Sequence, residues 1–345
     1  MPFYDPGTLY VDPILTELSV GWQDENLYAD QLMPETPVNT QSGRYRVFDR
    51  SDWLVHRSRR EPGTVANEVG ARKWSEDTFK TQEHSLQSAI TDEERQELMS
   101  QGGLADPVFG GDLQIDPEAD ATKYITRSIM LEREQKVANL IRNAANYAAN
   151  HKVTLAGTSR WDVYTFVTPG DPYSVVSNPV ADIKTACLRI YNDTGRWPNT
   201  MIIPVDATAI IENHPRVVTR YQYQSIFDPA AWKQIVGIPA AVGLNVIMVD
   251  SKINTADNVD LAENIVSLWG QDVWIGIVDP TPGQKTMTFG KTFAQKYPDG
   301  STKPTDRWRH EDRKSDLVRT SYKYDLKIVS ALAGYLITTA VNALP

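Results

Sequence analysis

Residues 116–150 read DPEADATKYITRSIMLEREQKVANLIRNAANYAAN, and this stretch decides the expected fold. Pro117 follows Asp116 as a first helical residue follows its N-cap, and no Pro or Gly recurs before Gly157. A helix over 117–150 would span roughly 50 Å, longer than a small domain is wide. The sequence therefore predicts a flat, elongated protein built along one long helix.

One apolar stripe follows this helix at three- and four-residue steps. Its members are Ile125, Ile129, Val137, Leu140, Ile141, Ala144 and Ala148. The charged residues Glu132, Arg133, Glu134, Lys136 and Arg142 are assigned to the other faces. We therefore expect a surface helix that packs one side on a sheet.

The composition favours a large globular protein with protein partners. A chain of 345 residues with 41% hydrophobic content can bury the cores of about two domains. A net charge of -9 argues against a dedicated nucleic-acid binder, so contact with DNA should be weak and independent of sequence. Cys187 is the only cysteine, which excludes an internal disulfide and zinc sites with several thiolates.

Neither end of the chain suggests a membrane. Residues 1–10 have no secretory signal pattern, so we expect cytosolic synthesis. The uncharged run 328–345 continues an alternating strand and is interpreted as buried protein.

Residues 1–40 contain five prolines among scattered apolar side chains, which is typical of an extended arm packed on its own core or on a neighbouring subunit.

Residues 41–88 are expected to form a long, projecting hairpin. Strand-like sequence at 44–48 and 74–86 flanks a turn at 61–64. Arginines gather in the first limb and acidic residues in the second. A solvated hairpin is one interpretation; we prefer an intersubunit contact, because Arg and Trp are favoured interface anchors. The candidate residues are Arg44, Arg46, Arg50, Trp53, Arg57, Arg59, Arg60 and Trp74.

The rest of the chain alternates between α/β and β patterns. Within 178–283 we expect helices at 179–193, 206–213 and near 229–236. Strands are expected at 200–204, at 244–249, where the strand should be buried, and within 265–278. After residue 284 the pattern returns to strands, with one at 286–293. Val318, Thr320, Tyr322, Tyr324, Leu326 and Ile328 alternate over a run that is long for a strand. A sheet long enough to match the long helix is implied.

Motifs for catalysis are absent from the sequence. It contains no HExxH, GxSxG, GxxxxGK or GxGxxG, and its five histidines are scattered. Asp206 and Asp250 follow expected strands, where α/β enzymes place catalytic groups, but short acidic residues also cap helices and turns there. Capping is the favoured interpretation, so no catalytic, cofactor or metal site is expected.

Several strings, in order, resemble the major capsid proteins of tailed bacteriophages. They are QSGRY-x-x-FDRSDW at 41–53, PGT at 62–64, ITDEER at 90–95, LEREQKVA at 131–138, TGRWPNT at 194–200 and KSD…AGYLI at 314–337. The resemblance implies an α+β, Hong Kong 97-type fold. Its parts would be an N-terminal arm (1–40), an E-loop (41–88), a P-domain with spine helix 117–150 (89–177), an A-domain (178–283) and P-domain return strands with the C-terminus (284–345).

The resemblance also implies a structural function. Hexamers and pentamers of the chain would form an icosahedral head shell enclosing packaged double-stranded DNA, in a virion assembled in the host bacterial cytoplasm. Partners would include a portal, a decoration protein and a separate scaffolding protein, since the chain has no room for its own scaffolding segment. No motif supports a crosslink through Lys73 or Lys80. The alternatives are an encapsulin-like compartment and, from another class, a soluble α/β hydrolase using Asp206 or Asp250.

Overall fold

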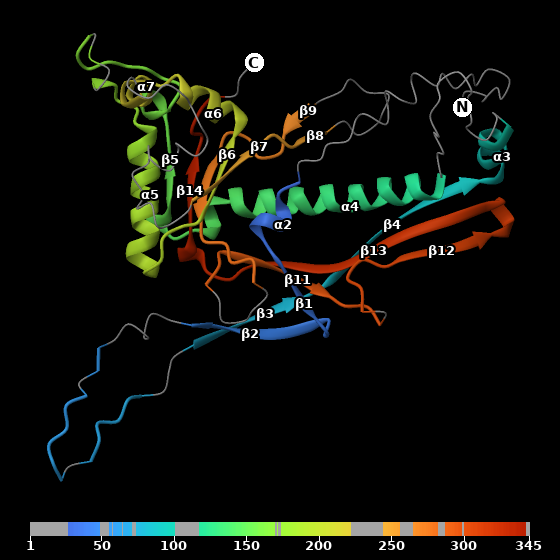
Figure 1. Cartoon of the computed structure of the whole chain (residues 1–345), viewed down its shortest axis with the longest axis horizontal. Helices are drawn as coiled ribbons and strands as arrows, with labels where there is room; N and C mark the ends of the chain where they lie inside the picture. Colours follow the sequence, from blue (N-terminus) through green and yellow to red (C-terminus); the bar gives the residue numbers. More distant parts are fainter. Residues whose placement is uncertain are drawn as a thin grey trace.

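The structure is a computed structural model in which a long helix joins two sheets (Figure 1). It describes residues 27–48, 55–56, 58–63, 65–70, 74–100, 117–169, 171, 174–221, 244–255, 265–281, 287–298 and 300–342. The long helix, α4, spans Pro117–Arg142. It runs from the short helix α3 (Asp92–Ser100) along one sheet and ends beside the second sheet.

The first sheet supports α4 along its length. Its strands are β1 (Glu35–Val38), β4 (Gln82–Thr91), β11 (Gly290–Gln295), β12 (Thr305–His310) and β13 (Ser315–Ile328). β13 pairs antiparallel with β4 on one side and with β12 and then β11 on the other, while β1 adds parallel to β11. The alternation in the sequence correctly predicted a long strand in β13, whose 14 residues carry this sheet.

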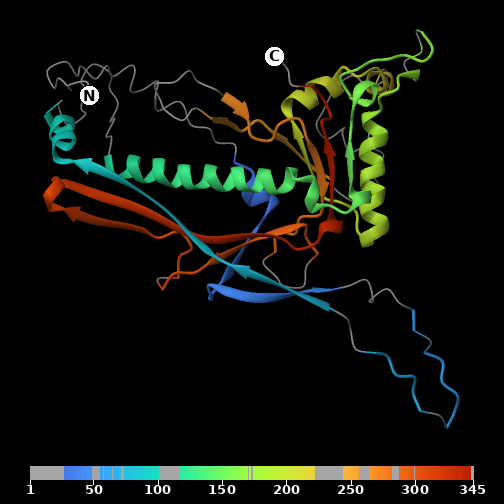
Figure 2. The same ribbon diagram turned by 180° about the vertical axis from the view of Figure 1, so that it is seen from behind.

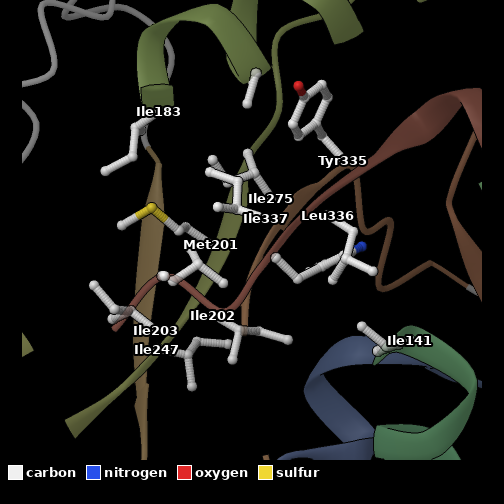
Figure 3. Packing of buried hydrophobic residues seen from close by; sticks show 14 of the residues in the cluster. Ile141, Ile183, Met201, Ile202, Ile203, Ile247, Ile275, Tyr335, Leu336 and Ile337 are labelled. Carbon is white, nitrogen blue, oxygen red and sulfur yellow. The ribbon is translucent and has the colours of Figure 1, made fainter. Parts of the chain in front are cut away.

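The second sheet contains the larger core. Its order is β5 (Lys152–Thr154), β14 (Gly334–Thr338), β10 (Val273–Gly276), β6 (Thr200–Pro204) and β7 (Asn245–Val249). Helix α5 (Pro179–Thr194) covers it, with α6 (Val205–Glu212) and α7 (Pro215–Tyr221) at one end. Figure 3 shows apolar side chains of these strands, of α5 and of α4 gathered into one cluster.

Local sequence accounts well for α5. The Asn178 side chain accepts from the Ala181 N–H, Pro179 stands at the first helical position, and Gly195 ends the helix with a left-handed φ of 70°. These three signals explain why the expected helix at 179–193 differs from the observed one by a single residue. The strand expected at 200–204 is also observed, whereas the helix expected near 229–236 lies outside the described residues.

The expected end of the long helix was wrong by eight residues. Asn143 leaves the helical conformation, and two 3-10 turns, Ala144–Asn146 and Ala149–His151, follow instead. The Asn146 amide donates to the Leu140 carbonyl and the Tyr147 hydroxyl donates to the Ile141 carbonyl, each at 2.7 Å. These side chains satisfy the last carbonyls of α4, so the helix stops although the alanines that follow favour helix. Its 26 residues span about 39 Å.

Three other expectations need correction. The second sheet crosses the expected boundaries of 178–283, because it includes β5 and β14. β7 was expected to be buried, yet it is an edge strand with Met248 exposed. The run after Ile328 does not continue β13, since the 3-10 turn Ala331–Ala333 transfers the chain to the second sheet. All three features depend on how distant strands pair in the two sheets, which the sequence alone does not show.

A hairpin and a short N-terminal segment complete the fold. β2 (Ser42–Phe48) pairs antiparallel with β3 (Trp74–Lys80), and the described residues 55–56, 58–63 and 65–70 extend beyond them away from both sheets (Figure 2). The helix α2 (Ala29–Leu32) lies against α4. Residues 27–40 therefore pack on their own core, while the arm expected over 1–26 lies outside the described residues. The remaining elements are β8 (Lys252–Asn254), β9 (Ile265–Ser267), and the 3-10 turns Gly157–Ser159 and Glu311–Arg313.

Candidate assembly surfaces

Polar pairs join β2 and β3 along the stem of the hairpin. Arg44 forms an ion pair with Glu76 at 3.3 Å, and the guanidinium of Arg46 lies 4.5 Å from the ring centroid of Trp74. These contacts face solvent, and each exposed pair of this kind contributes little stability. The stem is therefore ordered by its backbone ladder and by the surface on which its base rests.

The base of the hairpin is anchored on the first sheet. Tyr45 and Phe79 pack on Phe293 of β11, with the two phenylalanine rings stacked at 4.5 Å. Burial, with the adjacent Asp77, raises the pKa of Tyr45, whose hydroxyl donates to that carboxylate at 2.6 Å. The Lys80 N–H also donates to Asp325 of β13 at 2.8 Å. This aromatic contact directs the hairpin away from the body of the molecule.

The outer part of the hairpin presents a largely open surface. Arg59 and Arg60 are exposed, as are the apolar side chains of Val55 and Val65, which are 97% and 90% exposed. Trp74 is also exposed at the end of β3. Of the other candidate residues, Arg50, Trp53 and Arg57 lie outside the described part. The structure thus places Arg44, Arg46 and Trp74 together at the stem and Arg59 and Arg60 further out.

The apolar stripe of α4 divides between two clusters. Ile125 and Ile129 pack on Tyr322 and Tyr324 of β13, with Ala294 of β11, in a small cluster of their own. Val137 and Ile141 belong to the large core, where Leu140 and Ala144 are partly buried. Ala148 is exposed because the helix has ended. The expected contact between the stripe and the long strand is therefore observed at Ile125 and Ile129.

Sequence reasoning misplaced two charged residues of α4. Arg133 and Glu134 are 1% and 0% exposed, although both had been assigned to solvent faces. Lys136 is also half-buried, with its ammonium 5.6 Å from the ring centroid of Tyr324. A signal was present, since Arg133 stands in the four-residue row that joins Ile129 to Val137. A charged residue within an apolar row of a helix can therefore indicate a buried polar contact, as well as a break in the apolar face.

A second charged group, not anticipated from sequence, joins α3, α4 and the β12–β13 hairpin. Arg95 donates to Asp316 at 2.7 Å and to Glu118 at 2.9 Å, and Arg307 contacts the same two carboxylates. Hydrogen bonding to Arg95 holds the pKa of Asp316 below its usual value. Three arginines and three carboxylates take part: Arg95, Arg307, Arg309, Asp92, Glu118 and Asp316. They hold the far end of the first sheet against the start of α4.

The described residues offer little that resembles catalytic chemistry. Asp206 lies in the first turn of α6 but does not cap it, since Pro204 is the N-cap and no side chain caps this helix. Asp250 accepts a hydrogen bond from the Tyr28 hydroxyl at 3.1 Å. Burial raises the pKa of the Cys187 thiol to about 12, which keeps it protonated. Within the described ranges, no group of three His, Cys, Asp or Glu residues could hold a metal ion, and no helix has the length and apolarity to span a membrane.

Comparison with known proteins identifies the class. No protein-family model matches the chain. It is 26% identical over 335 residues to the major capsid protein of Burkholderia phage BcepMu, covering 95% of this chain and 96% of that protein. The chain is thus similar to a phage major capsid protein over almost its whole length, which supports a major capsid protein. A second relative, the major capsid protein of Pseudomonas phage JBD67, is 26% identical over 216 residues, which are 61% of this chain and 59% of that protein.

Solved structures agree on the fold of this capsid protein. A phage-related protein from Bordetella bronchiseptica matches with a TM-score of 0.67 at 23% identity, over 95% of this chain and 97% of that one. The capsid of cyanophage P-SCSP1u matches with a TM-score of 0.55 at 9% identity, over 91% and 88%. The fold is the Hong Kong 97-type capsid fold, as the sequence motifs implied. Together with the phage relatives, this fold supports a structural role in a virion shell.

Proposed function

We propose that copies of this capsid protein form hexamers and pentamers that close an icosahedral head shell around packaged double-stranded DNA. The observation that carries the proposal is the match to a phage capsid protein over 95% of the chain. The elongated form, with one helix joining two sheets and a hairpin projecting from them, suits a subunit that contacts neighbours at several separate places (Figure 1). Such a role requires no catalytic group, so we infer that the protein is not an enzyme.

The proposed parts follow the expected ranges, adjusted to the fold. Residues 1–40 would be the N-terminal arm and 41–88 the E-loop. The P-domain would consist of the first sheet with α4 as its spine. The A-domain would consist of residues 178–283 together with β5 and β14, because these strands complete its sheet.

The E-loop is the proposed intersubunit contact. Its base is fixed on Phe293, while its outer part exposes Val55, Val65, Arg59 and Arg60. Apolar side chains that are nearly fully exposed in one subunit gain from burial against another, and several arginines can steer acidic subunits into register. Arg44, Arg46, Arg50, Trp53, Arg57 and Trp74 belong to the same proposed contact.

A charge-reversal experiment tests the E-loop. The variant Arg57→Glu/Arg59→Glu/Arg60→Glu should remain folded and soluble but should fail to form shells. The matched control Lys184→Glu/Arg196→Glu/Lys252→Glu changes the net charge equally at exposed positions of α5, of the turn after it and of β8. Assembly is followed by light scattering and electron microscopy. Normal shells at a normal rate from the hairpin variant would contradict the proposal.

The same proposal includes the other components of the virion and the packaged DNA. Assembly would take place in the host bacterial cytoplasm with a separate scaffolding protein, a portal and a decoration protein. Contact with DNA should be weak and independent of sequence, because the net charge is -9. Negative-stain microscopy of the protein produced with its neighbouring gene products tests the whole: we expect closed shells containing nucleic acid. Shells that enclose a protein cargo instead would favour a compartment, and tight binding of the free subunit to one duplex would contradict weak DNA contact.

A further inference from the structure

β4 forms a long, open edge of the first sheet. Its ten residues pair one for one with residues 315–324 of β13, without a bulge, and within the described residues they pair with no other strand. Its exposed residues include Ser85, Leu86, Gln87 and Ala89. The second side of β4 is therefore a row of backbone donors and acceptors that another strand can join.

The register shows which backbone groups of β4 point outward. Ser321 of β13, which stands opposite Ser85, donates its N–H at 3.1 Å to the Pro304 carbonyl, on the side of β12. Opposite residues of an antiparallel ladder alternate between pairs that exchange both hydrogen bonds and pairs that exchange none. The pair at Ser85 exchanges none. The N–H and carbonyl groups of Ser85, Gln87 and Ala89 consequently point away from β13.

The other two edges of the first sheet carry features that block strand addition. β1 has only four residues and includes Pro37, and β12 carries Asp306, Arg307 and Arg309. Shortness, proline and charge are the usual means by which proteins protect an edge strand. Residues 85–90 of β4, SLQSAI, contain neither a charge nor a proline. This edge is therefore suited to receive an extended segment by strand addition.

The second limb of the hairpin, residues 65–70, has the properties of the added strand. The described residues between 55 and 70 belong to no strand, yet Val65 and Val69 are β-branched and would share one face of a strand. They are 90% and 56% exposed. Leu86 of β4, which is 43% exposed, offers an apolar side chain for contact across the two strands.

The charges of the two surfaces are complementary. Arg59 and Arg60 of the first limb are exposed, and the Asn67 amide donates to the Arg59 carbonyl at 3.5 Å, which places this arginine beside the second limb. The edge of β4 has an exposed acidic residue at each end, Glu83 within the strand and Glu93 just beyond it. A limb laid along this edge brings arginines toward carboxylates, which favours the encounter.

The limb that joins this edge comes from another copy. In its own subunit the hairpin is anchored on Phe293, and its outer part extends away from both sheets (Figure 2). It therefore points away from its own β4. A contact between two different surfaces of identical subunits is heterologous, and such contacts generate closed rings.

We propose that the edge of β4 is the surface that receives the hairpin: residues 65–70 of a second copy add to it as a further strand, alongside Ser85, Gln87 and Ala89. The inference rests on the proposed intersubunit role of the E-loop and names the surface that the E-loop meets. Backbone hydrogen bonds provide the affinity, and Leu86 with the acidic ends of the edge provides the specificity. Each subunit gives one strand and receives one.

A proline at one edge position tests the backbone contact. Gln87→Pro removes an outward N–H without removing a bond to β13, whereas the control Gln87→Ala keeps this N–H and loses the same side chain. We expect both variants to fold, by circular dichroism, and Gln87→Pro to form at least tenfold fewer closed particles than Gln87→Ala. If Gln87→Pro does not fold, Gln87→Lys/Ala89→Lys takes its place, because lysine also blocks strand addition at an edge.

Hydrogen exchange measures the same contact in the wild-type protein. On assembly, the amides of Ser85, Gln87 and Ala89 should exchange at least tenfold more slowly than in the free subunit. Shells that leave these three amides unchanged would overturn the proposal while the proposed function stands. Equal particle counts from Gln87→Pro and Gln87→Ala would do the same.

A crosslinking experiment identifies the two surfaces without requiring shells. Subunits carrying Val69→Cys are mixed with subunits carrying Leu86→Cys and treated with a short bis-maleimide, and the native Cys187 is buried. The control replaces Leu86→Cys by Asp306→Cys on the protected edge strand β12. We expect at least tenfold more crosslinked dimer from the first mixture. Equal yields would overturn the proposal, whereas a specific crosslink between subunits that build no shells would count against the proposed function alone.

Discussion

The two halves of α4 are buried in different ways. The first half places Ile125 and Ile129 on the tyrosines of β13, in a small cluster confined to the first sheet. The second half places Val137 and Ile141 in the large core that also contains the strands of the second sheet and α5 (Figure 3). The half that enters the large core should therefore contribute to the stability of the whole subunit. The other half should mainly fix the geometry of helix on sheet.

The largest effect is expected from a substitution that kinks α4 between its two halves. Lys136→Pro removes the hydrogen bond to the Glu132 carbonyl and clashes with the preceding turn, at a cost of about 3 kcal/mol or more. A large subunit can survive that cost, but the kink would change the angle between the two sheets in every copy of a shell. We expect folded protein by circular dichroism and few closed particles by electron microscopy.

Lys136→Ala is the control for this variant. Lys136 forms an ion pair with Glu132 and lies over Tyr324, and both variants lose these contacts equally. Only the proline variant changes the helix axis. Equal yields of uniform shells from the two variants would show that α4 does not set the geometry of assembly.

Cavity formation in the second half should have the next largest effect. Ile141 is 1% exposed within the large core, so Ile141→Ala should lower the free energy of unfolding by about 2–5 kcal/mol. The change should appear as a lower denaturation midpoint with an unchanged slope. A cost below about 1 kcal/mol would show that this half of α4 is not part of the cooperative core.

The same substitution in the first half should cost less. Ile129 is as buried as Ile141, but its cluster has few members and lies on one sheet, where neighbours can close around a cavity. Ile129→Ala should therefore cost about 2 kcal/mol, near the lower end of the range for such changes. Denaturant unfolding of the two variants side by side measures the difference. A larger cost at Ile129 than at Ile141 would show that the first half of α4, and not the second, contributes more to the stability of the subunit.

The smallest expected effect is a pH dependence at the contact between the middle of α4 and the first sheet. His84 of β4 lies between α4 and the sheet, with Lys136 and Glu132 facing it from α4 and the Tyr324 ring from β13. Burial, followed by the charge of Lys136, lowers the pKa of His84 below its usual 6.5. The unfolded chain then binds a proton first as pH falls through 6.5. Stability should fall from there down to the folded pKa, by at most about 1.4 kcal/mol per pH unit.

His84→Gln should flatten this dependence. His214, between α6 and α7, contributes over the same range, because burial lowers its pKa to about 4. The measurement therefore uses His214→Gln as its background and compares melting temperatures between pH 7 and pH 5 with and without His84→Gln. Identical slopes in the two proteins would show that His84 is not coupled to folding.

The sequence by itself determined the elements whose signals are local. The caps of α5 lie within three residues of its ends, and the alternation along β13 follows from the two-residue period of any strand with one buried face. The two strands of the hairpin and the overall capsid fold were likewise accessible, the latter through motifs spread along the chain. The helix and the strands depend on neighbours in sequence or on a pattern that one strand or helix carries alone. Each motif behind the fold is likewise a short, continuous string of residues.

Only the tertiary structure decided where α4 ends and what its charged residues contact. Its last carbonyls are satisfied by Asn146 and Tyr147, which can do so only because Tyr147 is held in the core against Phe289. Arg133 and Glu134 are buried because α2, more than 90 residues away in sequence, brings matching donors and acceptors to them. Periodicity shows which positions share a face of a helix. It cannot show whether that face meets solvent, a sheet or another charged group, because that depends on contacts between distant segments.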